Sequence, residues 1–167
     1  MKKMTAKEIA LGGIIAALYV VLTWLASILG LASGAVQVRF SEALCILPVF
    51  TFSAVPGLAV GCLLANLLTG CALWDVVFGS LATLIGAVGT RLLRHRPLLA
   101  WIPPVISNMV IVPIVLIRIY GVPDAWWFLL LTVGAGEIIS CGILGLLLWR
   151  ALNNPTTLKR MSLDESA

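Results

Sequence analysis

No lysine lies between Lys7 and Lys159 in this 167-residue chain. A Walker A loop needs a lysine directly after its glycines to hold nucleotide phosphates, so the chain carries no ATPase motif of this kind. Histidine is equally scarce, because the single one, His95, lies in a basic loop. Without a histidine in an apolar segment, no Ser/His/Asp or Cys/His set is available there. We therefore expect no enzyme activity and no catalytic residue.

The chain also lacks any pattern among its cysteines. The four cysteines are scattered through apolar sequence and form no C-x-x-C pair: Cys45, Cys62, Cys71 and Cys141. We interpret them as packed small hydrophobic residues rather than as a zinc or redox site. The expectation is that this chain binds no metal and no cofactor.

Charged residues make up only 11% of the chain, whereas 61% of its residues are hydrophobic. A soluble domain is roughly half apolar, and a fold of this size could not bury so much apolar surface in water. Lipid is therefore the solvent for most of the chain, as one membrane domain over residues 1–167. The net charge of +4 lies at the ends of apolar runs, so we expect no nucleic acid partner.

Most of the cations fall into three clusters that are separated by long apolar runs. The clusters comprise Lys2, Lys3 and Lys7, then Arg91, Arg94 and Arg96, and finally Arg150, Lys159 and Arg160. Cationic clusters beside membrane spans mark the cytoplasmic side. If all three lie inside, the chain crosses the membrane an even number of times between each pair.

Hydropathy and breaker residues predict an all-α polytopic membrane protein with both termini cytoplasmic (residues 1–7 and 153–167). The six predicted transmembrane helices are Glu8–Leu29, Ser41–Phe52, Val55–Leu68, Trp74–Leu93, Leu98–Ile119 and Ala125–Leu152. The second and third are short and broken, because Pro48 and Pro56 interrupt a segment that must enter the membrane and return. The alternative is four helices with a re-entrant hairpin at 41–69. Short, interrupted segments often mark binding sites in transporters.

Small residues recur at helical spacing in the first span, where they let another helix approach closely. The stripe comprises Ala10, Gly12, Gly13, Ala16 and Ala17. It is either a packing face within the chain or a docking face for a partner subunit, and the sequence leaves both open.

A few polar side chains lie in or beside apolar segments, where unpaired charge is expensive. The strongest functional candidate is Glu137, about a dozen residues into the last span; the alternative is a neutral or Arg-paired structural carboxylate. Arg39 and Glu42, three residues apart, could simply be an ion pair, and Asp75 could be only a helix N-cap. Amides at Asn66 and Asn108 fit interhelical hydrogen bonds as well as ligand contact.

The outer-side tryptophans have two interpretations. Trp74, Trp126 and Trp127 could anchor the chain at the membrane interface or form a stacking platform for a flat ligand. Taken with the acids and amides, they predict a substrate pocket in the outer half of the molecule, because a pocket for a small molecule is apolar with few polar groups.

Several blocks of the chain resemble the QueT family. They are Val38-Arg39-Phe40-Ser41-Glu42-Ala43-Leu44, Pro48, Val55-Pro56-Gly57-Leu58, Gly61-Cys62-Leu63-Leu64-Ala65-Asn66, and Trp74 through Leu84. The resemblance covers most of the chain and is densest from about 37 to 90. It implies a six-helix substrate-binding S component of an energy-coupling factor (ECF) transporter for queuosine precursors, in the plasma membrane of a bacterium.

The resemblance also implies partners and a ligand. The partners would be an ECF scaffold transmembrane protein and two ATPase subunits that use ATP, with the small-residue stripe of the first span as the docking face. The ligand would be a planar 7-deazaguanine, whose guanine edge suits a carboxylate. Alternatives are an S component for another vitamin or nutrient and a solitary proton-coupled carrier that uses Glu137.

Overall fold

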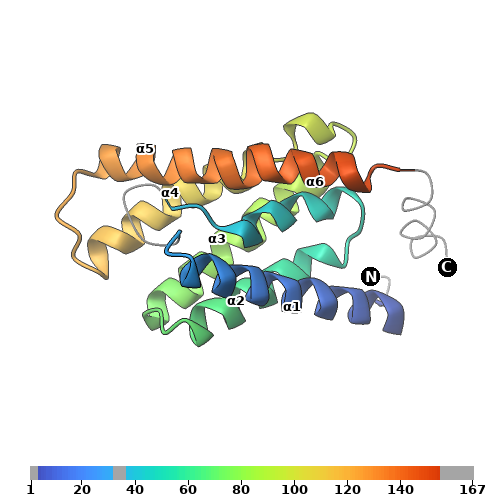
Figure 1. Cartoon of the computed structure of the whole chain (residues 1–167), viewed down its shortest axis with the longest axis horizontal. Coiled ribbons are helices and arrows are strands. Elements are labelled where there is room, and N and C mark those ends of the chain that lie inside the picture. The colour runs from blue at the N-terminus through green and yellow to red at the C-terminus, as the bar shows by residue number, and fades with distance from the viewer. Residues whose placement is uncertain (1–3, 32–36, 155–167) are drawn as a thin grey trace.

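The computed structural model describes residues 4–31 and 37–154 (Figure 1). Within these ranges every regular element is a helix, which confirms the all-helical prediction. The α-helices are α1 (Ala6–Ile28), α2 (Ala54–Leu68), α3 (Leu73–Leu92), α4 (Ile102–Arg118), α5 (Trp126–Glu137) and α6 (Gly145–Leu152). Two 3-10 segments, η1 (Phe40–Val49) and η2 (Pro97–Leu99), and a π-helical segment, η3 (Ile138–Leu144), complete the fold.

Four helical segments in the described ranges are long and apolar enough to cross a membrane: Ala6–Ile28, Leu73–Leu92, Pro97–Arg118 and Trp126–Leu152. The last of these is α5, η3 and α6 read as one continuous helix. The apolar helices η1 and α2 are shorter, with 10 and 15 residues. At about 2.0 Å and 1.5 Å per residue each extends only about 20 Å, less than the roughly 30 Å hydrocarbon core.

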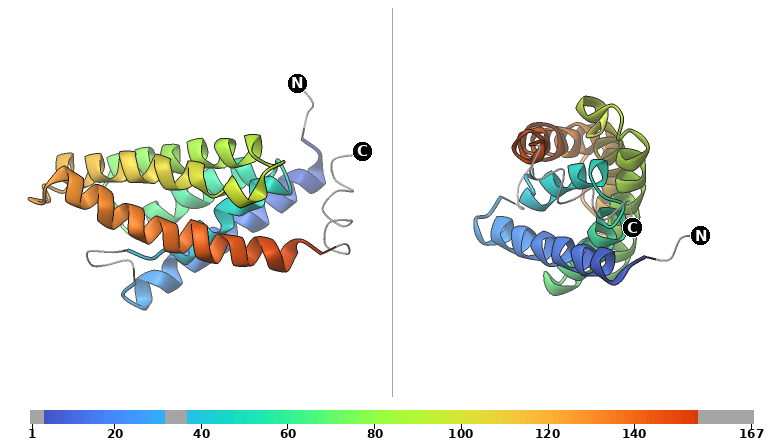
Figure 2. Two further views of the ribbon diagram at one scale, coloured as in Figure 1. Left: turned by 90° about the horizontal axis from the view of Figure 1, so that it is seen from above. Right: turned by 90° about the vertical axis from the view of Figure 1, so that its right-hand side faces the viewer.

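The direction of the chain alternates from one long element to the next (Figures 1 and 2). The start of α1, the connection from α3 to α4 and the end of α6 all lie at one end of the molecule (Figure 1). The cationic stretches on these segments therefore share an end, as the charge pattern requires. Assignment of that end to the cytoplasm stays a prediction, and Lys2, Lys3, Lys159 and Arg160 lie outside the described residues.

The short segment η1 lies at the centre of the fold. It packs against α1, α2, α3, α6 and η3, and seven of its residues are buried, among them Glu42 and Pro48. Pro48 falls inside the helix, and its carbonyl accepts a hydrogen bond from Nη1 of Arg91 at 3.1 Å. In place of the helix predicted at Ser41–Phe52, the chain thus forms a tighter 3-10 helix over Phe40–Val49. The Arg91 side chain is hydrogen-bonded near the C-terminal end of this helix.

Close helix contacts explain the glycines of the bundle. A Cβ at Gly57 would lie 2.7 Å from the carbonyl oxygen of Gly12, and one at Gly61 would lie 3.0 Å from Cα of Ala16. The α1–α2 contact therefore needs glycine on α2. Similarly, a Cβ at Gly86 of α3 would lie 2.6 Å from Cα of Pro104 on α4. Small residues thus let these neighbouring helices pack with their backbones nearly touching.

Candidate substrate-binding site

Two buried acidic residues lie on or directly beside the packed segments η1 and η3. Glu42 lies in the first turn of η1 and is 1% exposed, and Glu137 is the last residue of α5 and is 8% exposed. Both flank a departure from ordinary α-helical winding. Long 3-10 segments and π-helical turns are uncommon and often mark functional sites.

Glu42 accepts hydrogen bonds from two neighbours. The phenol of Tyr19 on α1 donates to its Oε1 at 2.5 Å, and the thiol of Cys45 donates to its Oε2 at 3.0 Å. Cys45 can reach Glu42 because a 3-10 helix has three residues per turn, so positions i and i+3 lie directly above one another. Beside them, the hydroxyl of Thr23 donates to Ser41 at 2.8 Å, which ties α1 to the start of η1.

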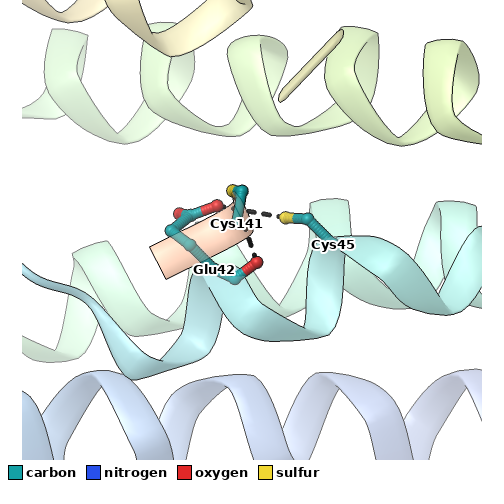
Figure 3. Close-up of side chains that lie close together, drawn as sticks. All are labelled: Glu42, Cys45 and Cys141. Atoms are coloured by element: carbon teal, nitrogen blue, oxygen red, sulfur yellow. Dashed lines mark hydrogen bonds between the residues drawn. The ribbon is translucent and has the colours of Figure 1, made fainter. Parts of the chain in front are cut away.

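Glu137 is bound through a second thiol. The Sγ of Cys141, four residues on, lies 3.3 Å from Oε2 of Glu137 and 3.5 Å from the backbone carbonyl of Glu42. Cys141 therefore bridges the two acidic residues, and Figure 3 shows Glu42, Cys45 and Cys141 pointing toward one another. The side chain of Asn108, which is 4% exposed, hydrogen-bonds to Glu137 from α4.

Arg39 supplies the positive charge of this cluster. Its guanidinium interacts electrostatically with both Glu42 and Glu137, yet among the described residues it forms no ion pair with either at contact distance. Instead, Nη2 lies 3.5 Å from Oε1 of Gln37, and the backbone N–H donates to Oγ of Ser140 at 3.1 Å. The i, i+3 spacing of Arg39 and Glu42 thus does not produce a simple ion pair, and the cation serves both acids.

We call these six side chains the acid–thiol cluster: Arg39, Glu42, Cys45, Asn108, Glu137 and Cys141. They come from the segment before η1, from η1, and from α4, α5 and η3. The cluster combines two acceptors that can ionise, one permanent cation, one amide and two weak thiol donors. Such a set can recognise a small molecule that offers several polar groups along one edge.

Asp75 and Asn66 form a second, separate polar group. Asp75 accepts a hydrogen bond from the phenol of Tyr120 at 2.9 Å, and that phenol accepts one from the N–H of Ala72 at 3.0 Å. Partial burial, reinforced by the bond to Asp75, raises the pKa of Tyr120, which keeps the phenol protonated as a donor. The amide of Asn66 lies 3.6 Å from Sγ of Cys62 and borders Gly79, as Asp75 does. Within residues 4–31 and 37–154, no hydrogen bond joins Asp75 to Glu42 or Glu137.

The three tryptophans predicted for the site lie on the surface of the molecule. Trp74, Trp126 and Trp127 are 60%, 48% and 63% exposed. Trp74 stacks on Phe78 with ring centroids 6.1 Å apart, and both rings line a surface hollow.

 This hollow measures about 620 Å³, and it is also lined by Arg118 but by neither Glu42 nor Glu137. This exposure fits anchoring at the membrane interface, and the indoles do not stack over the acid–thiol cluster.

The small-residue stripe of α1 divides into two faces. Gly12 and Ala16 are buried against α2, so this register serves packing within the chain. Ala10, Gly13 and Ala17 are exposed, and a Cβ at Gly13 would meet nothing within 4 Å among the described residues. Both interpretations of the stripe therefore have residues to support them, on different sides of the same helix.

Analysis of the sequence missed two members of the acid–thiol cluster, and also Tyr19, which donates to Glu42. Cys45 and Cys141 were interpreted as packed hydrophobic residues, although each follows a glutamate by three or four positions, which places them beside it on a helix. Tyr19 was not singled out at all. Its only signal is a hydroxyl within an otherwise charge-free span, and a buried phenol usually needs a partner.

Comparison with known proteins places the chain in a family. An 86-residue stretch is 35% identical to the queuosine precursor transporter QueT of Lactococcus lactis subsp. cremoris (strain MG1363), and it covers 51% of this chain and 50% of that protein. The comparison thus spans about half the length of this curated relative. No solved structure matches the chain. Residues 9–154 match the QueT transporter family, and since this range includes most of the chain and the whole acid–thiol cluster, the chain belongs to that family.

Proposed function

We propose that this protein is the substrate-binding S component of an ECF importer, and that it captures a 7-deazaguanine precursor of queuosine on the outer side of a bacterial plasma membrane. The observation that carries the proposal is the acid–thiol cluster, in which the buried Glu42 and Glu137 are joined through Cys141, with Arg39 and Asn108 among the other members. The name of the Lactococcus relative supplies the ligand class. A buried charge in a membrane span is retained when it is paired, solvated or functional.

The chemistry of a deazaguanine suits this set of side chains. Its guanine edge presents a ring N–H beside an amino group, and one carboxylate can accept both as a bidentate pair. Arg39 or Asn108 can donate to the neighbouring carbonyl. With both glutamates ionised, the cluster has a net charge of −1 (two carboxylates and one guanidinium), so an aminomethyl cation on the ligand would neutralise it.

Ligand binding has to replace the hydrogen bonds that the carboxylates already accept. Two of these come from thiols, at 3.0 Å to Glu42 and 3.3 Å to Glu137. A thiol is a weak donor, whereas a bond between a carboxylate and a ligand cation is charge-assisted and roughly twice as strong as a neutral one. The exchange is therefore favourable for a cationic deazaguanine and less so for a neutral base.

The energy for transport would come from other chains. The proposed partners are a scaffold transmembrane protein and two ATPase subunits, because the chain has no Walker lysine of its own. The exposed face of α1 at Ala10, Gly13 and Ala17 offers a surface on which a scaffold helix can approach closely.

Calorimetry on purified protein tests the ligand. We expect 7-aminomethyl-7-deazaguanine to bind more tightly than guanine, and Glu42→Gln to weaken its binding while Asp75→Asn does not. A panel of other bases and vitamins runs alongside. Tight binding of one of these compounds, with no binding of any deazaguanine, would contradict the proposed ligand but would leave the proposal of an S component standing.

A solitary proton-coupled carrier is the second candidate. It is favoured by one observation: two acidic residues are buried close together, since Sγ of Cys141 contacts both the Glu137 carboxylate and the backbone carbonyl of Glu42. Uptake into liposomes that contain only this chain distinguishes the candidates. Uptake driven by a proton gradient without any ATPase would support the carrier and contradict the S component.

A further inference from the structure

We propose that Glu42, Cys45 and Cys141 form a binding site for a thiophilic divalent cation, with Zn²⁺ as the preferred ion. One carboxylate oxygen and the two Sγ atoms all lie within 4.8 Å of one another. Figure 3 shows that the three side chains converge from η1 and from the π-helical segment. The cation site lies within the acid–thiol cluster and shares all three of these residues with the proposed substrate site, but it needs no deazaguanine to form.

The distances require little rearrangement. Zn–S bonds are about 2.3 Å and Zn–O bonds about 2.0–2.2 Å, so the ligand atoms of a tetrahedral site lie a little under 4 Å apart. The Sγ of Cys45 is already 3.0 Å from Glu42. Contraction of the remaining pairs by about an ångström or less is therefore enough, which side-chain rotation can supply.

The chemical type of the three ligand atoms favours Zn²⁺ over other divalent ions. Two thiolates are soft ligands that suit Zn²⁺ and disfavour Mg²⁺ and Ca²⁺, which prefer oxygen. Three protein ligands would leave the fourth tetrahedral position open, as in zinc sites that bind an exchangeable group. Glu137 stands beside one of the three ligands, since its Oε2 is 3.3 Å from Sγ of Cys141.

Charge balance also favours a divalent ion. Once Glu137 has taken up a proton, two thiolates and one carboxylate carry −3, and Zn²⁺ with the Arg39 guanidinium carries +3, so the buried assembly is neutral. Binding releases the two thiol protons. The proton of Cys141 has the Glu137 carboxylate beside it as an acceptor, and the proton of Cys45 goes to solution.

Titration of purified protein with Zn²⁺ and Co²⁺ tests the site. The protein carries no polyhistidine tag, is kept reduced by a phosphine, and contains no deazaguanine. We expect one equivalent of either ion to bind, and the Co²⁺ form to show thiolate-to-metal charge-transfer absorption. Cys45→Ser and Cys141→Ser should weaken binding by more than the roughly 10–100-fold that loss of an outer-shell partner costs.

Two matched variants serve as controls. Cys62→Ser removes a buried thiol outside the site, and Cys71→Ser removes a partly exposed one. Both variants should bind Zn²⁺ within about twofold of the affinity of the unaltered protein, a much smaller change than the losses expected for Cys45→Ser and Cys141→Ser. The proposal is overturned if the unaltered protein binds no ion, if its Co²⁺ form lacks thiolate absorption, or if the controls lose binding equally. The first two outcomes need no variant to fold, and none of the three bears on deazaguanine binding.

Discussion

Tyr19 links α1 to the acid–thiol cluster. Its phenol is 1% exposed and donates to Oε1 of Glu42. The tyrosine therefore holds the carboxylate in place from α1, while Cys45 holds the other oxygen from within η1. A buried acceptor that loses its donor costs more free energy than the hydrogen bond itself contributes.

Replacement of Tyr19 by phenylalanine should lower the free energy of unfolding by about 1–3 kcal/mol, because Oε1 of Glu42 would be left without its phenol donor. Tyr120→Phe is the matched control, since this phenol is largely exposed, and surface changes usually stay within about 0.5 kcal/mol. Chemical unfolding in detergent measures both. Equal effects of the two substitutions would contradict the role assigned to Tyr19.

Glu137→Gln should weaken deazaguanine binding by roughly 1–3 kcal/mol, the range for a hydrogen bond that involves a charged group. The amide keeps the shape of the side chain but removes the negative charge. Asp75→Asn is the comparison, because Asp75 lies in the separate group with Tyr120. Isothermal titration calorimetry gives both affinities, and an unchanged affinity for Glu137→Gln would remove that residue from the site.

Sequence patterns identified the acids of the site but not their thiol partners. Glu42 and Glu137 were recognisable because charge is costly in an apolar segment. Cysteine carries no such cost, so Cys45 and Cys141 looked like any packed residue. Whether a thiol three or four positions away faces its glutamate depends on helix winding, which hydropathy does not report. Asp75 was grouped with the other acids because topology alone could not separate one outer polar group from another.

At the scale of the elements, the contact between α1 and α2 depends on glycine. A Cβ at Gly61 would lie 2.8 Å from Cβ of Tyr19 and 3.0 Å from the backbone of Ala16. Neither neighbour can move without shifting α1, and Tyr19 is itself a donor to Glu42. The fit of these two helices and the position of the carboxylate are therefore coupled.

Gly61→Ala should destabilise the protein by about 1–3 kcal/mol, because the added methyl group overpacks this contact. Gly13→Ala, on the same helix pair but facing open space, should instead be neutral or stabilising by up to about 1 kcal/mol, since alanine favours helix. Unfolding curves of the two variants should shift in opposite directions. A loss of stability in both would mean that the exposed face of α1 is also packed within the chain.

Gly13→Leu addresses the docking face rather than the fold. A leucine at this exposed position should hinder close approach of a scaffold helix and reduce recovery of the complex with the ATPase-bearing partners. Deazaguanine binding to the isolated chain should stay unchanged. Co-purification and calorimetry report the two effects, and a parallel loss of ligand binding would point to packing within the chain instead.

Hydropathy predicts the bounds of the long helices well, but it does not predict the 3-10 winding of η1 or the π-helical winding of η3. The predicted span Trp74–Leu93 matches α3, Leu73–Leu92, to within one residue. The segment predicted as Ser41–Phe52 forms a 3-10 helix, and Ala125–Leu152 contains a π-helical stretch. Both deviations arise where buried segments pack against each other, and tertiary packing overrides local propensity there.

For the whole molecule, the arrangement of the charged ends predicts its orientation. The loop that contains His95 lies at the same end as the start of α1 and the end of α6, opposite the connection from α4 to α5 (Figure 1). Cationic loops face the cytoplasm. The acid–thiol cluster would then lie between the two membrane faces.

Cysteine labelling in whole cells tests this orientation. In a Cys71→Ser background the other native thiols are buried. We expect Asp124→Cys to react with a membrane-impermeant maleimide and His95→Cys to react only after the cells are made permeable. The reverse pattern would invert the topology and place the proposed capture site on the wrong side for an importer.

The winding of η1 has a consequence for the spacing of the chemical groups along it. Successive turns of a 3-10 helix bring Glu42 and Cys45 into one row, whereas an α-helix would rotate them about 60° apart and shorten ten residues from about 20 Å to about 15 Å. Relaxation of η1 toward α-helical winding would thus withdraw the thiol from the carboxylate and retract the segment together. A change of pitch in one short helix would free an acceptor and alter the depth at which it sits.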